Sequence, residues 1–212
     1  MNKLIHNILC IPIKHWDKFY IAGGTLIKLF QNKLIKSYSF SAKLKSDIDL
    51  FITNQENYDI IYQCLKNYHS ELIGTDKAFT FESRYDINGD YTKEWLNQFR
   101  IQLIKKTAMP EKQINEFDFT VCSCAFEPHI QKFTYVDTFF EDIRRKKLAL
   151  NKSQKLDLSY FRIQKYAYSK GFKMDKELKK MIKEDKLCMR CKRRLQCITD
   201  ENKKCAYDNY NF

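Results

Sequence analysis

The 212-residue sequence has no long apolar run and no leader-like beginning. Its best apolar stretch, ILCIPI, is broken by Pro12 and followed closely by Lys14, and it is far shorter than a membrane span. The first residues also lack the charged, apolar and small-residue regions of a signal peptide. We therefore expect a cytoplasmic protein with no membrane partner. If the protein is virus-encoded, we expect it in the host cytoplasm or the virion.

Histidine is scarce, and its four positions, 6, 15, 69 and 129, are scattered. This spacing supports neither a histidine-based metal centre nor a histidine-activated nucleophile. The sequence also shows no internal repeat, low-complexity tract or obvious flexible linker. With 44% hydrophobic and 30% charged residues, the composition is that of a folded chain long enough for one large domain or two small ones.

Positive charge is plentiful but unevenly placed. Residues 1–135 contain 17 Lys and Arg against 15 Asp and Glu, a net of +2, whereas residues 136–212 contain 21 against 11, a net of +10. A basic back half favours a polyanionic partner such as RNA, DNA or a nucleotide. The alternative is a solvated helical surface that happens to be rich in lysine.

Apolar periodicity predicts a mixed front part and a helical back part. Strands are predicted at KFYIAGG, DIDLFI, KAFTFES, QFRIQLIKK and EFDFTVCSCAF, and helices at TLIKLFQNKLI, about 55–69 and after Pro110. Further helices are predicted at about 137–148, 157–170 and 174–186, with Gly171 ending the second of these three. The sequence thus indicates an α/β (α+β) fold, with a head domain at 1–135, a basic helical module at 136–187 and a cysteine-rich tail at 188–212.

Two carboxylates stand one residue apart in the predicted strand KSDIDLFI. Since strand side chains alternate, Asp47 and Asp49 share one face, about 6–7 Å apart. Ile48, Leu50 and Ile52 share the other face. In EFDFTV, Asp118 likewise lies opposite the apolar face. Two Mg²⁺ ions held by these three carboxylates would relieve the repulsion and could serve phosphoryl or nucleotidyl transfer. A D-x-D pair also occurs by chance, but an EF-hand loop is excluded because Ile52 and Tyr58 stand where Gly and Glu are required.

A Gly23–Gly24 pair follows the first predicted strand and opens a helix. It can be a simple tight turn, or it can cradle phosphate groups with backbone N–H groups. The order of strand, Gly-Gly-Thr, helix, SDIDLF and a later aspartate resembles the nucleotidyltransferase superfamily, which includes the DNA polymerase beta-like enzymes. This resemblance implies that Gly23, Gly24 and Thr25 bind the incoming nucleotide, that Asp47 and Asp49 bind two Mg²⁺ ions, and that Asp118 helps to activate the acceptor hydroxyl.

The back half is similar to the poly(A) polymerase and tRNA nucleotidyltransferase branch of that superfamily. LDLSYFRIQKYAYSKGF resembles the basic helix of those enzymes, with Arg162 and Lys165 on its last two basic positions, Tyr166 on its Phe and Gly171 in its closing pair. The resemblance, spanning about residues 19–175, implies that Arg162 and Lys165 bind the nucleotide, NTP being one partner and RNA or tRNA the other. The chain looks like a compact, phage-type member.

Three functions follow from this pattern. The favoured one is Mg²⁺-dependent transfer of a nucleoside monophosphate from an NTP to an acceptor hydroxyl on RNA. The second is a binding or structural protein, for example of a phage, that keeps the fold with little or no catalysis; Ile27 and Lys28, which replace the Arg-Asp pair of the enzymes, favour it. The third is a toxin or defence nucleotidyltransferase with a different acceptor.

The C-terminal cysteines form a separate motif. Cys188, Cys191, Cys197 and Cys205 have the spacing C-x2-C-x5-C-x7-C, which suits four thiolate ligands of a structural Zn²⁺ ion. Free cysteines are the equally weighted alternative, and an iron–sulfur or redox role is a minor one. Cys122 and Cys124 are predicted to be small strand residues.

Overall fold

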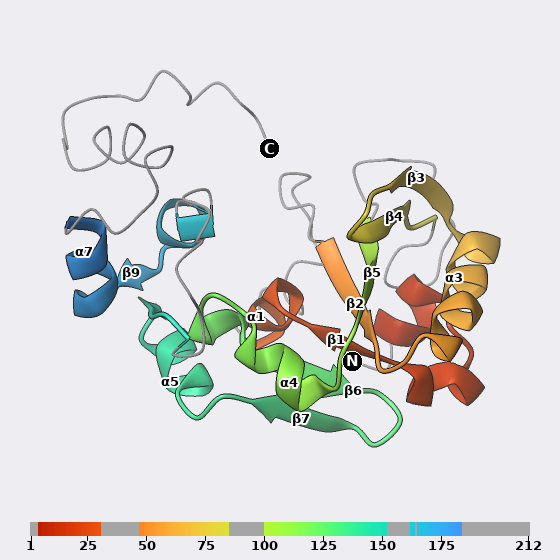
Figure 1. Cartoon of the computed structure of the whole chain (residues 1–212), viewed down its shortest axis with the longest axis horizontal. Helices are drawn as coiled ribbons and strands as arrows, with labels where there is room; N and C mark the ends of the chain where they lie inside the picture. Colours follow the sequence, from red (N-terminus) through yellow and green to blue (C-terminus); the bar gives the residue numbers. More distant parts are fainter. Residues whose placement is uncertain (1–3, 31–46, 85–99, 152–161, 164, 184–212) are drawn as a thin grey trace.

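The computed structural model describes residues 4–30, 47–84, 100–151, 162–163 and 165–183. Its centre is a seven-stranded mixed sheet with the order β3-β4-β5-β2-β1-β6-β7 (Figure 1). The strands are β1 (Phe19–Ala22), β2 (Asp47–Ile52), β3 (Ser70–Gly74), β4 (Ala78–Glu82), β5 (Arg100–Thr107), β6 (Cys124–Glu127) and β7 (Lys132–Tyr135). β2 and β5 are parallel, and the other neighbours are antiparallel.

Helices surround this sheet. The regular helices are α1 (Gly24–Phe30), α3 (Glu56–Tyr68), α4 (Pro110–Asn115), α5 (Phe139–Arg144) and α7 (Lys176–Lys183). Short irregular helices are η1 (Leu4–Leu9), η2 (Ile13–Lys18), η4 (Thr120–Cys122) and η5 (Lys165–Ser169). The predicted α/β class is therefore confirmed. No helix of the described residues is long and apolar enough to cross a membrane.

The two central strands follow directly from the sequence. β2 alternates as predicted: Ile48, Leu50 and Ile52 are fully buried, whereas Asp47 and Asp49 are half-buried on the other face. Tyr20 of β1 stacks on Phe51, with ring centroids 5.5 Å apart, and its hydroxyl donates a 2.9 Å hydrogen bond to the Ala108 carbonyl. These contacts bring the end of β1 against the β2 carboxylates.

Helix α3 agrees with the helix predicted at about 55–69, and just before it Asn54 Oδ1 accepts a 3.0 Å hydrogen bond from the Asn57 amide. Its Tyr62 packs on Phe79 and Phe81 of β4. Ile60 and Tyr68 of the same helix are 36% and 43% exposed, so they lie at the edge of its buried face or outside it.

The segment around Asp118 differs from the prediction. EFDFTVCSCAF is not one strand: Thr120–Cys122 forms a 3₁₀ turn, and β6 begins only at Cys124. The amides of Cys122 and Ser123 donate to the carbonyls of Phe119 and Thr120, which bends the chain out of the sheet. Asp118 therefore precedes a turn and does not project from a sheet strand.

The described residues from α5 onward, called the C-terminal segment from here on, pack on this turn. Thr120 Oγ1 donates a 2.6 Å hydrogen bond to buried Asp142 of α5, and the rings of Phe119 and Tyr166 are 5.5 Å apart. A small parallel sheet joins β8 (Lys147–Leu148) to β9 (Lys173–Met174), next to α7 (Figure 1). The predicted helix at 137–148 thus ends early, at Arg144. Contacts cross the predicted boundary at residue 135, and the division into domains remains a prediction.

Candidate nucleotide-binding site

The glycine turn lies beside the paired carboxylates. Ala22, the last residue of β1, is the register partner of Asp49 on β2. Gly23 then turns the chain with φ of +82°, a conformation that favours glycine. A Cβ atom at Gly23 would lie 3.3 Å from Asp49 Oδ2. The backbone of the turn therefore passes close to the carboxylate, too close for a side chain to fit without a shift.

Asp49 carries an incompletely compensated negative charge. Burial, followed by the charge of Asp47, raises the pKa of Asp49 to about 7. Lys165, Arg162 and Lys170 oppose this rise, in that order. The site thus brings two carboxylates of the head together with three cations from the C-terminal segment, although more than a hundred residues separate the two groups in sequence.

Thr25 lies in the first turn of α1, directly after the two glycines. Its side chain is buried, with 2% exposure, and its hydroxyl donates a 2.6 Å hydrogen bond to the Asp47 carbonyl. This bond ties the start of α1 to the start of β2. The Thr25 hydroxyl is thus engaged with the backbone of the site, and a role of Thr25 in nucleotide binding remains a prediction.

Asp118 and Arg162, predicted to have separate roles, form an ion pair. Arg162 Nη1 lies 2.7 Å from Asp118 Oδ2, and the Arg162 side chain is 41% exposed. Burial raises the pKa of Asp118, while the charge of Arg162 lowers it. The charge of Arg162 also lowers the pKa of Asp49, so Arg162 lies close enough to act on both carboxylates.

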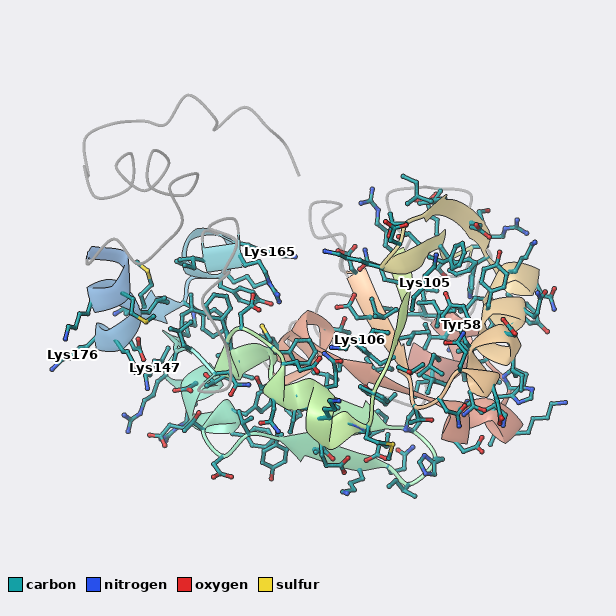
Figure 2. All side chains as sticks on the ribbon, in the orientation of Figure 1. Tyr58, Lys105, Lys106, Lys147, Lys165 and Lys176 are labelled. Carbon is teal, nitrogen blue, oxygen red and sulfur yellow. The ribbon has the colours of Figure 1, made fainter. Side chains whose placement is uncertain are left out.

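Two lysines complete the positive side of the site. Lys165 is exposed, and Figure 2 shows its side chain extending from the C-terminal segment toward the side on which β2 lies. Lys170 was not predicted: its Nζ lies 3.5 Å from the point that a Cβ at Gly24 would occupy. No feature of the sequence singled it out among 30 lysines. As predicted, Gly171 ends this segment, with φ of +69°.

The carboxylate pair fits a divalent cation. Its oxygens are the ligands that Mg²⁺ prefers, and the turn at Gly23 passes close to Asp49 Oδ2. Within the described ranges, no three His, Cys, Asp or Glu residues are grouped so as to hold a metal ion. The convergence of Asp118 with Asp47 and Asp49 therefore remains a prediction.

Six of the eight cysteines have roles predicted from the sequence. Cys188, Cys191, Cys197 and Cys205 lie outside the described residues, so the zinc site also remains a prediction. Cys122 and Cys124 are fully buried, and burial raises the pKa of both thiols, that of Cys124 to about 12. Such thiols suit packing rather than metal binding.

Solved structures with a similar fold are CCA-adding enzymes. A CCA-adding enzyme in complex with ATP matches with a TM-score of 0.59 and 15% identity, over 95% of this chain and 51% of that one. The Bacillus stearothermophilus CCA-adding enzyme in complex with CTP matches with a TM-score of 0.57 and 14% identity, over 87% of this chain and 44% of that enzyme. The Thermotoga maritima CCA-adding enzyme complexed with tRNA matches with a TM-score of 0.54 and 15% identity, over 87% of this chain and 45% of that enzyme. The chain has a nucleotidyltransferase-like fold and spans about half the length of these enzymes.

The sequence model of one protein family matches the chain over residues 1–146, from the N-terminal helices through α5. The chain belongs to the Gabija anti-defense 2 family. No curated protein matches the sequence.

Proposed function

We propose that this protein is a divalent-metal-dependent nucleotidyltransferase that moves a nucleoside monophosphate from an NTP to an acceptor hydroxyl. The observation that carries this proposal is the Asp47–Asp49 pair, half-buried beside the Gly23 turn and faced by cations from the C-terminal segment. A triphosphate bound with Mg²⁺ matches this arrangement, because its metal needs the carboxylates and its phosphates need the cations.

Each group has a defined task in this reaction. Asp47 and Asp49 would hold Mg²⁺, which when bound would stabilise the charge that develops on the phosphate oxygens. Gly23 and Gly24 would allow the triphosphate to approach the backbone closely. The acceptor oxygen would form a bond to the α-phosphorus, and the bond between that phosphorus and the leaving pyrophosphate would break.

Asp118 would accept the proton of the acceptor hydroxyl. A general base must be ionised, and the nearby Arg162 guanidinium favours the ionised form of Asp118 against the effect of burial. Arg162 would then face both Asp118 and the nucleotide, with Lys165 beside it. The ion pair thus connects the role of Asp118 to that of the basic segment.

RNA is the favoured acceptor. The net charge of +10 in residues 136–212 would attract a polyanion. Structures of similar fold include enzymes in complex with tRNA. The family description adds a biological setting, namely the counteraction of Gabija defence, in which the modified hydroxyl would belong to a component that this defence needs.

A non-catalytic role is the second candidate, and the Arg162–Asp118 pair favours it. Arg162 lies 2.7 Å from Asp118 Oδ2 and so engages an oxygen that a general base would need for the proton. In that case the family's effect on Gabija defence would come from binding alone.

Activity with labelled nucleotides would separate the two. The protein is incubated with each labelled NTP, Mg²⁺ and total RNA, and transfer is followed on a denaturing gel; Asp49→Asn is the inactive control. We expect label in RNA with the wild type and at least about a hundredfold less with the variant. In parallel, both proteins are expressed in cells that carry Gabija. Protection against the defence by wild type and Asp49→Asn alike, with no transfer, would favour the binding role.

A further inference from the structure

Lys170 is held at the glycine turn by an aromatic ring. Its ammonium lies 4.3 Å from the centroid of the Tyr166 ring, a cation–π distance. Tyr166 is itself buried, and its hydroxyl lies 2.9 Å from Cys122 Sγ. The ring therefore has a fixed position, and the half-buried lysine rests on a fixed platform.

The same two side chains flank Gly24. A Cβ atom at Gly24 would lie 3.3 Å from Tyr166 Oη and 3.5 Å from Lys170 Nζ. The ammonium thus points at the backbone of the turn rather than into bulk solvent. A group that approaches this backbone would come within reach of the ammonium.

The three cations that act on Asp49 differ in how they are placed. Arg162 is engaged with Asp118 at 2.7 Å. Lys165 is exposed. Lys170 alone of the three is positioned against the glycine turn.

We propose that Lys170 binds a phosphate group of the NTP at the Gly23–Gly24 turn, with Tyr166 as the positioning residue beneath it. This assignment rests on the proposed nucleotide-binding function. A lysine ammonium is a compact point charge with three donors, which suits a non-bridging phosphate oxygen beside the half-buried Gly24. The cation–π contact restricts the lysine before the nucleotide arrives, and less side-chain freedom is then lost on binding.

The test is equilibrium binding of a fluorescent ATP analogue with Mg²⁺ to the full chain. Lys170→Met keeps the unbranched stem over the Tyr166 ring and removes the charge. We expect its affinity for the ATP analogue to fall about tenfold to a hundredfold, and that for the corresponding AMP analogue to fall less. Lys173→Met, an exposed lysine three residues further on, is the matched control and should bind like the wild type. Tyr166→Phe, which keeps the ring, should retain most of the affinity.

A second measurement does not depend on the folding of a variant. Lysine acetylation of the wild type, read by mass spectrometry, should slow at Lys170 but not at Lys173 when ATP and Mg²⁺ are added. Tight ATP binding that is equal in wild type and Lys170→Met, or acetylation of Lys170 that ATP does not slow, would overturn the assignment while leaving the proposed function intact. A wild type that binds no NTP would overturn both.

Discussion

Replacing Asp49 by Asn is expected to stabilise the metal-free protein. In the folded chain the pKa of Asp49 is raised from 3.8 to about 7, by burial and by Asp47. Between these two pH values the folded chain keeps a proton that the unfolded chain has released. The free energy of unfolding therefore falls as pH rises from about 4 to about 7, and the loss persists above that range.

The size of the effect follows from the pKa difference. The rise from 3.8 to about 7 corresponds to about 4 kcal/mol when fully expressed, at about 1.4 kcal/mol for each pH unit. Asp49 keeps some solvent exposure, which reduces the expected difference to about 2–4 kcal/mol. Asn cannot ionise, so Asp49→Asn should escape this loss.

The assay is urea unfolding of both proteins at about pH 4 to 8 in EDTA. We expect the stability of Asp49→Asn minus that of the wild type to grow by about 2–4 kcal/mol across this range. Asp59→Asn, which changes an exposed aspartate on α3, is the matched control and should track the wild type. Added Mg²⁺ should stabilise the wild type above pH 7 and have little effect on Asp49→Asn. A difference that does not change with pH would show that Asp49 carries no uncompensated charge.

Two further substitutions, at Gly23 and Thr120, test the contacts that hold the site together, through the free energy of unfolding in urea. Gly23→Ala should lower the free energy of unfolding more than Gly171→Ala does. Both residues have positive φ, which costs an alanine about 1–2 kcal/mol. Only at Gly23 does the new methyl group contact Asp49, whereas nothing lies within 4 Å of a Cβ at Gly171. Equal losses would contradict the close approach at Asp49. Thr120→Val removes the hydroxyl that donates to buried Asp142, and we expect a loss of about 1–3 kcal/mol. A loss below about 0.5 kcal/mol would mean that this hydrogen bond does not fasten α5 to the turn.

Local patterns in the sequence predicted the centre of the fold well. The alternation of DIDLFI placed Ile48 and Leu50 in the core and the two aspartates on the opposite face, because both sides of a central strand have a defined environment. The start of α4 at Pro110 and the end of a helical segment at Gly171 were also predictable from the sequence. Each depends on a backbone constraint of the residue itself.

Edges and tertiary contacts were not predictable in the same way. Strands β3 and β7 were missed because most of their residues are exposed or half-buried and lack a clean apolar alternation. The turn at Thr120–Cys122 was predicted to be strand because apolar and polar residues alternate in FDFTV. Its conformation depends instead on hydrogen bonds from Thr120 to the Ala149 carbonyl and the Asp142 carboxylate. Lys170 has no local signal, since only the fold brings its ammonium to Gly24.

The most direct test of the proposed site is a crystal structure with Mn²⁺ and a non-hydrolysable ATP analogue, using the anomalous signal of manganese. We expect a manganese peak between the carboxylates of Asp47 and Asp49, with the triphosphate lying along Gly23 and Gly24 and its charges facing the C-terminal lysines. A nucleotide bound elsewhere, or manganese absent from the two carboxylates at saturating concentration, would contradict a nucleotidyltransferase site built from both halves of the chain.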